Sequence, residues 1–531
     1  MSTILLSTLN ARYSHTSFGL RCLRAAMGPL HDQTEIAEFT INDSLHSVLA
    51  DIVERNPRIL GLGVYIWNVE LIVSLLRDLV RLLPHTTVVL GGPELAGTPE
   101  NREHAELIEL ADYVITGEGD HAFAALCTQI LAGTPPQSRF INAGAANLRE
   151  LPLPYGEYTD TDLAERIVYV ELSRGCPFTC EFCLSALDIP VRIYPLQEFL
   201  VAMDELLKRG LRQFKFVDRT FNLNIRLSEA VLQFFLQRLS PDLFLHFEMI
   251  PDRLPDSLKT LLARFPAGTV QLEIGIQTFN ADVGELISRR MDVETTEQNL
   301  TWLRDNTSVH LHTDLIAGLP GETLESFAAG FDRLYRLRPQ EIQVGILKRL
   351  KGTPILRHEE SHQLMWSSRA PFEVFSTSTM SWGELELIRL FARFWDLYAN
   401  SGNFTGSLTL VVGDESPWLR LMHFFKWVAD AEQRRHGIAL IRLFERMFQY
   451  LTEQQGSDPQ DCAEIIWRDY TSSGRRDKPR FLREFSLPGI GRPAGSSPRA
   501  GSSPARQRRH TAAEDSSSET SDSAAADRGS H

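Results

Sequence analysis

The stretch Cys176-Pro177-Phe178-Thr179-Cys180-Glu181-Phe182-Cys183 places three cysteines within eight residues, in a chain of 531 residues that has six cysteines in all. Three thiolates at this spacing can converge from one loop on a compact metal centre. Short runs of thiolates hold iron–sulfur clusters, usually with four ligands, and no fourth cysteine lies nearby. A site with three thiolates leaves one iron free to bind another molecule, which is what a catalytic cluster requires.

Two other interpretations of the three cysteines stay open at this point: a structural zinc site and three unrelated buried thiols. Zinc prefers four protein ligands in closed structural sites, and no histidine falls within the loop. The other three cysteines, Cys22, Cys127 and Cys462, stand alone and are expected to be packing thiols. Six cysteines in so long a chain are also too few for a disulfide scaffold.

The cysteine loop follows the first of six strand-like apolar runs that alternate with helical patterns. These predicted strands are Ile167–Leu172, Gln213–Val217, Phe244–Met249, Val270–Gly275, Val309–Ile316 and Ile342–Leu347. Six consecutive βα units predict a partial barrel, because right-handed parallel crossovers curl the sheet. We therefore expect a (β/α)6 partial barrel over residues 163–360.

A second alternating series precedes the barrel, in residues 1–133. Its predicted strands are Ile4–Leu9, Ile36–Ile41, Ile59–Tyr65, Thr87–Leu90 and Tyr113–Thr116. Near-continuous apolar strands that alternate with amphipathic helices favour a doubly wound parallel sheet of the α/β class. Such sheets bind ligands beyond the carboxyl ends of their strands.

The remaining segments are predicted from composition and periodicity. Residues 134–162 contain several prolines and no clear period, so a linker is expected there. Residues 361–485 carry helical apolar patterns and predict a mostly helical C-terminal domain. Residues 486–531 are rich in Ser, Ala, Gly, Pro and Arg and are expected to be a disordered tail, with the Arg506–Arg509 patch solvated.

Composition narrows the functional class. Hydrophobic residues make up 43% and charged residues 23%, which is ordinary for a globular protein with large cores. The net charge of −14 argues against general nucleic-acid binding. We find no apolar run long enough to span a membrane and no secretory signal, so no membrane partner is expected. A cytoplasmic location is expected because an oxygen-sensitive iron–sulfur cluster that needs low-potential electrons fits a reducing compartment.

The CxxxCxxC loop resembles that of radical S-adenosylmethionine (SAM) enzymes, and the six βα units look like their partial barrel. The resemblance implies a [4Fe–4S] cluster on Cys176, Cys180 and Cys183, whose open iron chelates SAM. It further implies that electron transfer from the cluster cleaves SAM to a 5′-deoxyadenosyl radical. In such enzymes the cofactor carries the chemistry and the protein positions it.

Further segments, Gly275–Asn280 and Asp314–Glu322, are similar to the barrel of the oxygen-independent coproporphyrinogen oxidases and their relatives. That similarity implies that Gln277 and Arg289 contact the carboxylate end of SAM, as suits the bidentate donors of arginine. Glu248 and Asp314 would contact its amino or ribose groups, and Phe182 would pack near the adenine. A glycine-rich stretch common in the family after the second strand is replaced here, so Asp218 or Thr220 is expected to substitute for it.

A doubly wound domain ahead of a radical SAM barrel resembles the cobalamin-binding domain of the cobalamin-dependent radical SAM group. The resemblance implies a cobalamin site at the strand ends, formed by Gly63, Tyr65, Gly91, Gly92, Gly117 and Glu118. Paired glycines allow a bulky ligand to approach the backbone. The DxHxxG motif that supplies a histidine ligand in many cobalamin domains is absent, so binding without a protein histidine is expected, with His15 an ordinary loop residue.

These features predict a cobalamin-dependent radical SAM enzyme. The resemblance implies methylation of an unactivated carbon as the most common outcome, and it leaves ring contraction or cyclisation open. One alternative is a radical SAM enzyme whose N-terminal domain is vestigial or binds substrate. Another is a non-catalytic iron–sulfur protein. The expected partners are a small-molecule substrate of unknown identity and an electron donor such as flavodoxin or ferredoxin, and no nucleic acid.

Overall fold

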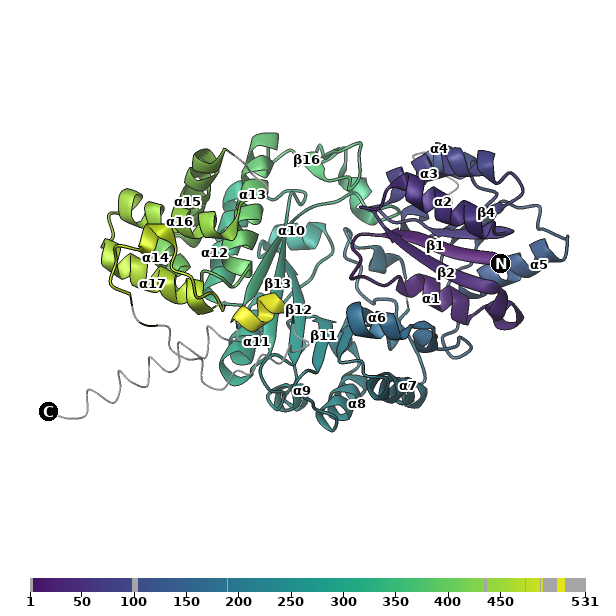
Figure 1. The fold of residues 1–531 in the computed structure, drawn as a ribbon, viewed down its shortest axis with the longest axis horizontal. Helices are drawn as coiled ribbons and strands as arrows, with labels where there is room; N and C mark the ends of the chain where they lie inside the picture. The colour runs from purple at the N-terminus through teal and green to yellow at the C-terminus, as the bar shows by residue number, and fades with distance from the viewer. Residues whose placement is uncertain are drawn as a thin grey trace.

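The computed structural model describes residues 3–97, 104–188, 190–413, 415–433, 437–472, 474–487, 489 and 504–510. The chain forms a parallel sheet at the N-terminus, a second parallel sheet in the centre and a helical region at the C-terminus (Figure 1). The first sheet and the helical region lie on opposite sides of the central sheet (Figure 1). The predicted α/β class and the order of its three parts are confirmed.

The first sheet has six parallel strands in the order β2-β1-β3-β4-β5-β6. The strands are β1 (Ile4–Asn10), β2 (Thr34–Thr40), β3 (Ile59–Gly63), β4 (Thr87–Gly91), β5 (Tyr113–Thr116) and β6 (Phe140–Asn142). Between them lie α1 (Phe18–Ala25), η1 (Gly28–Gln33), α2 (Leu45–Arg55), α3 (Val69–Leu82), η2 (Pro93–Leu95), α4 (Ala105–Glu109) and α5 (Asp120–Leu131). A separate apolar core lies on each face of the sheet, which is why its strands are almost continuously apolar.

Strand β6 lies inside the segment that the sequence predicts as a linker. Its three residues pair in parallel with β5, from Val114–Phe140 to Thr116–Asn142. So short a strand between proline-containing turns has no period of its own, and only the neighbouring edge of β5 makes it a strand. The chain then passes through η4 (Pro154–Glu157) and α6 (Asp160–Glu165) to the second sheet.

The second sheet is the partial barrel, with six parallel strands in the order β14-β13-β12-β11-β10-β7. The strands are β7 (Val168–Val170), β10 (Gln213–Phe216), β11 (Phe244–Met249), β12 (Val270–Gln277), β13 (His310–Ala317) and β14 (Glu341–Ile346). The helices between them are α7 (Leu196–Lys208), η6 (Phe221–Leu223), α8 (Ile225–Leu236), α9 (Asp256–Leu262), α10 (Ala281–Leu286), α11 (Val293–Asn306) and α12 (Leu324–Arg336). Sequential strands are therefore neighbours, as expected for repeated right-handed βα units.

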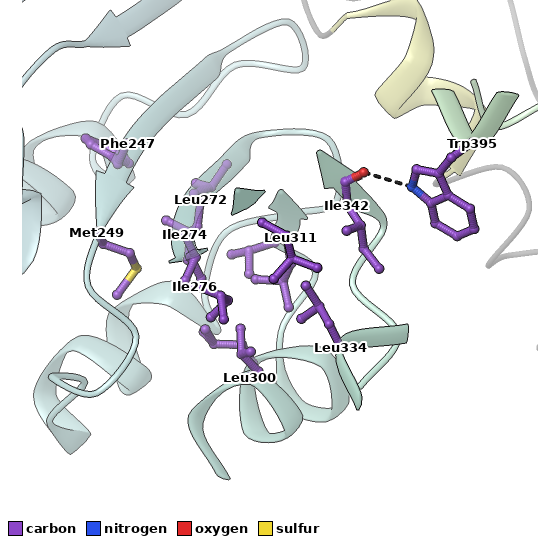
Figure 2. Close-up of a cluster of buried hydrophobic side chains, with 14 of the residues drawn as sticks. Phe247, Met249, Leu272, Ile274, Ile276, Leu300, Leu311, Leu334, Ile342 and Trp395 are labelled. Carbon is purple, nitrogen blue, oxygen red and sulfur yellow. Dashed lines mark hydrogen bonds between the residues drawn. The ribbon is translucent and has the colours of Figure 1, made fainter. Parts of the chain in front are cut away.

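Alternation along the barrel strands separates an apolar outer face from a polar interior. On β12, Leu272, Ile274 and Ile276 are buried and point towards the helices that carry Leu300 and Leu334 (Figure 2). The residues between them on the same strand include Glu273, Gly275 and Gln277. Because successive strand residues face opposite sides, the second set faces the interior of the barrel.

The C-terminal region shares one continuous apolar core with the outside of the barrel. Its elements are η7 (Pro354–His358), β15 (Met365–Trp366), β16 (Val374–Ser376), α13 (Trp382–Trp395), the π-helix η8 (Asp396–Asn400), α14 (Ser407–Val412), α15 (Pro417–Glu432), α16 (Leu440–Gln449), the π-helix η9 (Tyr450–Gln454), α17 (Pro459–Ser472) and η10 (Arg480–Leu482). The indole of Trp395 donates a hydrogen bond of 2.8 Å to the carbonyl of Ile342 on β14 (Figure 2). The helices are thus packed as a continuation of the barrel.

The disordered-tail prediction is wrong for one described segment. Residues 505–510 are helical, and Gln507 and His510 are buried. Arg506, expected to be solvated, lies 3.2 Å from Glu341 and 2.9 Å from Asp396. Glu341 begins β14 and offers a carboxylate at the base of the barrel, a tertiary partner that composition does not register. Residues 488, 490–503 and 511–531 of the predicted tail lie outside the described residues.

The first domain docks beside the barrel through a buried charge network. Arg21 of α1 lies 2.9 Å from Glu38 and 2.8 Å from Asp162, and Arg166 contacts the same two carboxylates. The loop after β1 continues this contact, because Ile167 donates to the Ser14 carbonyl at 2.7 Å. The carboxyl side of the first sheet is thereby held against the barrel. Among the described residues, no helix is long and apolar enough to cross a membrane.

Candidate active site

The cysteine loop is closed at its base by a short antiparallel ladder between β8 (Ser173–Arg174) and β9 (Arg192–Ile193). Gly175 follows β8 with a φ of +91°, and a Cβ there would lie 2.8 Å from the carbonyl oxygens of Asp188 and Pro190. Only glycine fits this close approach of backbone to backbone. The short helix η5 (Leu184–Leu187) follows Cys183 and completes the loop.

A cavity of about 190 Å³ lies between the cysteine loop and the carboxyl ends of the barrel strands. Nine of the ten residues that the sequence predicts for the cluster and SAM line it. They are Cys176, Cys180, Cys183, Phe182, Thr220, Glu248, Gln277, Arg289 and Asp314. The fold therefore brings together residues that are separated by up to 138 positions in the chain, from Cys176 to Asp314.

Gln277 and Arg289 form one wall of the cavity. Gln277 ends β12 with a φ of +71°, next to a bulge in the pairing of β12 with β13. Bulges and left-handed non-glycine residues redirect side chains and cluster at functional sites. Arg289 donates to the Gly275 carbonyl, and its Nη1 lies 3.8 Å from Cys180 Sγ. Burial raises the pKa of the Cys180 thiol, and the Arg289 guanidinium opposes that shift.

Carboxylates from three adjacent strands, those of Glu248, Glu273 and Asp314, also line the cavity. Burial raises the pKa of Glu248 to about 7 and also raises the pKa of Asp314. Glu273 behaves differently, because the His246 ring, 2.9 Å away, outweighs burial and lowers the pKa of this carboxyl to about 2. The cavity thus combines one firmly ionised carboxylate with two that burial makes less acidic.

Asp218 is the predicted site residue that does not line the cavity. Its buried carboxylate accepts hydrogen bonds from the Leu172 backbone, at 3.0 and 3.2 Å, and from Ser173 Oγ at 2.6 Å. These contacts fix the chain where β7 passes into the cysteine loop. Asp218 therefore supports the loop from behind, whereas Thr220 lies 4.0 Å from Cys176 Sγ.

Glu273 and Arg219 line the cavity but are not among the residues that the sequence predicts. Glu273 could have been found from the alternation on β12, because it shares the inward face with Gly275 and Gln277. Arg219 stands between two predicted residues, Asp218 and Thr220, in a stretch without a clear period. Nothing in its local sequence indicates which of the three points inward.

The carboxyl edge of the first sheet presents an aromatic pair at the point where the strand order reverses, between β1 and β3. Tyr65, a predicted cobalamin residue, stacks on Trp67 with ring centroids 4.6 Å apart. Trp67 is 42% exposed, and its indole donates to the Leu9 carbonyl at 3.1 Å. Asn68 fixes this turn from below, since its amide donates to Thr8, Leu9 and Gly63 and accepts from the Tyr65 backbone. Trp67 and Asn68 were not predicted, although both follow directly on a predicted strand.

The other predicted cobalamin residues lie at the ends of β3, β4 and β5. Gly63 and Gly91 end their strands, and Gly92 has a φ of +116°, where a Cβ would lie 2.4 Å from the Val64 carbonyl oxygen. A Cβ on Gly117 would likewise meet the Gly144 backbone at 2.8 Å. These glycines let neighbouring turns pack closely along the sheet edge.

Glu118 joins the two domains. Its carboxylate accepts hydrogen bonds from Arg192 at 2.6 and 2.8 Å, from the Ala146 backbone at 2.9 Å and from Arg174 at 3.4 Å. Both arginines belong to the β8–β9 ladder below the cysteine loop. Glu118 therefore ties the edge of the first sheet to the base of that loop.

His15 is held against the barrel. Its ring contacts the Tyr169 hydroxyl on β7, and its backbone pairs with Ile167 in a parallel bridge. The loop that carries a histidine ligand in many cobalamin domains thus lies along the edge of the barrel here, with the His15 ring turned to Tyr169.

The donor set of the cavity suits an iron–sulfur cluster and a polar ligand beside it. Three thiols line the cavity, and Gln277 Oε1 is buried without a hydrogen-bond partner among the described residues, whereas Asp314 Oδ1 lies 3.5 Å from His312 Nε2. Buried polar atoms are normally paired, so the Gln277 acceptor fits a donor of a bound molecule. In the described part of the chain, no group of three or more His, Cys, Asp or Glu side chains could hold a single metal ion. A cluster places each thiolate on a different iron, so its ligands stand further apart than those of one zinc ion.

Comparison with known families divides the chain into three matched segments. Residues 5–127 match the B12 binding domain, and residues 170–334 match the radical SAM superfamily. Residues 360–488 match a protein family of unknown function (DUF4080). The first match covers the first sheet except for β6 and the start of β1, and the second covers the barrel sheet except for β14 and the start of β7.

Two curated relatives show similarity over parts of the chain. A ribosomal protein uS12 methylthiotransferase, RimO from Pelobacter propionicus, is 27% identical over 194 residues, which are 35% of this chain and 43% of the relative. The cobalamin-dependent radical SAM methyltransferase TokK from Streptomyces tokunonensis is 24% identical over 339 residues, 58% of this chain and 49% of TokK. The chain thus spans less than half the length of either relative.

Two solved structures share the fold. The radical SAM methyltransferase TsrM from Kitasatospora setae aligns with a TM-score of 0.55 and 19% identity, over 68% of this chain and 78% of TsrM. The cobalamin-dependent radical enzyme OxsB aligns with a TM-score of 0.61 and 12% identity, over 89% of this chain and 83% of OxsB. These two likenesses concern the fold, whereas the family matches show that the chain combines a B12 binding domain with a radical SAM domain, whose cofactors are cobalamin, a [4Fe–4S] cluster and SAM.

Proposed function

We propose that this protein is a cobalamin-dependent radical SAM enzyme that transfers a methyl group to an unactivated carbon of a small molecule. The observation that carries the proposal is the cavity in which Cys176, Cys180 and Cys183 face Gln277, Arg289 and Asp314. Methyl transfer as the outcome is supported by the similarity to the methyltransferase TokK over 58% of the chain. The substrate is unassigned.

In this proposal the residues that line the cavity have separate roles. The three cysteines hold the cluster, and Arg289, with its planar set of donors, binds the carboxylate of SAM. Gln277 Oε1, which has no hydrogen-bond partner in the described chain, and the Asp314 carboxylate, whose Oδ1 lies 3.5 Å from His312 Nε2, accept hydrogen bonds from the amino or hydroxyl groups of SAM. Phe182, between two cysteines, packs against the adenine.

When bound, the cluster and SAM supply the radical that removes a hydrogen atom from the substrate, and cobalamin supplies the methyl group. Glu118 fixes the position of the two sites relative to each other, because it links the edge of the first sheet to Arg174 and Arg192 below the cysteine loop. The Tyr65–Trp67 pair, in which Trp67 is exposed, gives that edge an aromatic surface for a large flat ligand. A small electron-transfer protein is the proposed source of reducing equivalents.

Anaerobic reconstitution with iron, sulfide and hydroxocobalamin, followed by incubation with SAM and dithionite, tests this function. We expect bound iron and corrinoid in the ultraviolet–visible spectrum and release of 5′-deoxyadenosine. Once a substrate is found, S-adenosylhomocysteine should form as well, because a second SAM restores the methyl group on cobalamin. Cys176→Ala should abolish deoxyadenosine release, whereas Cys462→Ala, a buried thiol far from the loop, should retain it.

Two outcomes would contradict the proposal in different ways. Deoxyadenosine release without corrinoid uptake would leave a radical SAM enzyme whose first domain has another role. Equal release from Cys176→Ala and Cys462→Ala would show that the cysteine loop does not hold the active cluster.

A further inference from the structure

Glu181 lies inside the cysteine loop, between Cys180 and Phe182, and its side chain is only 3% exposed. A buried carboxylate is strongly unfavourable unless charged or hydrogen-bonding partners surround it. A buried glutamate in a loop that also carries several negative thiolates therefore requires partners that stabilise its charge.

The carboxylate of Glu181 is surrounded by three side chains from two distant segments. Ser288 Oγ donates to Oε1 at 2.8 Å, and Arg357 Nε donates to Oε2 at 2.8 Å, with a second Arg357 contact to Oε1. The His358 ring nitrogen Nε2 lies 2.8 Å from Oε2. We call these three residues the Glu181 anchor. They stand 107, 176 and 177 positions further along the chain.

The backbone of Glu181 is tied to the same two segments. Its N–H donates to the Ile287 carbonyl at 3.0 Å, and its carbonyl accepts from the Ile355 N–H at 2.9 Å. Ser288 directly precedes Arg289, whose guanidinium lies 3.8 Å from Cys180 Sγ. One residue of the loop thus couples the cysteines to the Arg289 wall of the cavity.

The other half of the loop is held differently. Cys176 is fixed by its own backbone hydrogen bond to Asp188 and by the β8–β9 ladder, both close in sequence. Within the described residues, Cys180 and Cys183 have no ladder beside them, and a hydrogen bond of 3.0 Å from the Cys183 N–H to the Cys180 carbonyl joins them to each other. The Glu181 anchor connects this half of the loop to the rest of the barrel.

We propose that Glu181 is a positioning residue that fixes Cys180 and Cys183 for the cluster, through Ser288 on one side and Arg357 and His358 at the start of the C-terminal region on the other. This inference rests on the proposed assignment of the three cysteines as cluster ligands. In this proposal η7 supports the active site, because Arg357 and His358 hold the cysteine loop from outside the barrel.

The test measures cluster retention in Glu181→Gln, in the reconstituted full-length protein. The amide keeps the size of the side chain but turns an N–H₂ group towards the donors of Arg357 and His358. Changes in residues that support metal ligands typically weaken metal binding by about 10–100-fold. We expect iron release to a chelator to be at least about tenfold faster than in the wild type, with an altered electron paramagnetic resonance spectrum of the reduced cluster.

Four further variants separate positioning from general destabilisation. Arg357→Ala removes a side chain that is 62% exposed, so the protein should fold, and iron release should again be faster, with partial recovery in Arg357→Lys. Glu360→Gln changes an exposed carboxylate in the following turn and should behave as the wild type. Phe331→Leu, in the buried core outside the barrel, should lower the unfolding temperature and leave the cluster spectrum unchanged.

The inference is overturned if Glu181→Gln releases iron at the wild-type rate. It is also overturned if Glu181→Gln and Phe331→Leu release iron equally fast at the same loss of unfolding temperature. Cys180→Ala distinguishes a failure of the underlying assignment: if that variant still assembles a normal cluster, the cysteine loop is not the ligand set, whatever Glu181→Gln does.

Discussion

The two parallel sheets of this protein place their candidate binding sites differently: one at the carboxyl edge of the sheet, the other on its inner face. The first sheet carries an apolar core on each face, so only the turns at its carboxyl edge can meet a ligand. The barrel sheet packs one face on helices and turns alternate polar residues such as Glu273 and Gln277 inward. One fold principle thus gives an edge site in one domain and an interior site in the other.

The carboxylates of the two regions differ in the same way. At Glu38 and Glu118, arginine partners outweigh burial and hold the pKa of each carboxyl below its ordinary value. At Glu248 and Glu322 in the barrel, burial dominates and raises the pKa to about 7, whereas the His246 ring keeps their barrel neighbour Glu273 ionised. The edge of the first domain is therefore built for docking through ion pairs, whereas the barrel keeps carboxyl groups that can hold a proton near neutral pH.

The largest effect is expected for Gly175→Ala, which should break the barrel site alone. A left-handed backbone costs an L-residue about 1–2 kcal/mol, and the Cβ would also press on two carbonyl oxygens. Because about 1.4 kcal/mol is a factor of ten, iron bound after reconstitution should fall at least about tenfold. Corrinoid uptake should persist.

Gly133→Ala is the matched control for this change. Gly133 has a φ of +76°, but a Cβ added there would meet no described atom within 4 Å, so only the backbone strain is reproduced. Normal iron content in Gly175→Ala, or equal loss in both variants, would show that the close backbone approach does not shape the cysteine loop.

The reciprocal change is Gly92→Ala, which should break the edge site alone. Gly92 has φ +116° and ψ 167°, a region that only glycine adopts readily, and a Cβ would collide with the Val64 carbonyl. Strain of about 1–3 kcal/mol predicts corrinoid affinity reduced by about tenfold to a hundredfold, with iron content unchanged. Titration of the variant with hydroxocobalamin measures the affinity.

Gly97→Ala controls for a left-handed glycine in the same connection, since its φ is +77° and no described atom would lie within 4 Å of its Cβ. If Gly92→Ala loses iron and corrinoid together, the two sheets do not form independent sites and the comparison fails.

The difference between the two sheets also explains how much could be predicted from sequence. Most strands of both sheets were predictable because their apolar runs are local, and nine cavity residues followed from the resemblance of the cysteine loop and the barrel segments to known families. Strand β6 was not predictable, because three residues acquire strand geometry only from the adjacent β5. The helix at residues 505–510 depends in the same way on Glu341, a partner 165 positions away from Arg506.

The anchoring residues were harder to predict than the site residues. Asp218 was expected near SAM, and its position in the motif does not reveal that it accepts from Leu172 and Ser173 instead. Glu181 reads as a solvated residue in a loop, since its three partners come from beyond position 287. Motifs mark what touches a cofactor, whereas the support behind it depends on tertiary contacts.

Glu322→Gln tests the contrast between the carboxylates through the free energy of unfolding and not through cofactor content. Burial raises the pKa of Glu322 from 4.5 to about 7, so the folded state holds this proton more tightly than the unfolded state. The resulting stabilisation is complete below about pH 4.5 and is lost as the pH rises through about 7. Glutamine stays neutral and can still accept from Thr278 and Ser326, so at pH 8 the variant should unfold with a free energy about 1–3 kcal/mol higher than the wild type.

Glu38→Gln extends the same experiment, because here the substitution is expected to lower the free energy of unfolding at pH 8 instead of raising it. The pKa of Glu38 is lowered, so its stabilisation is present above its ordinary pKa and is lost as the pH falls through the folded value. At pH 8 this variant should be less stable than the wild type, because Arg21 and Arg166 lose their charged partner. Urea unfolding at pH 5 and pH 8 measures both. If Glu322→Gln gains no stability on going from pH 5 to pH 8 relative to the wild type, the barrel carboxyls are ionised like those of the edge, and the two regions do not differ in this respect.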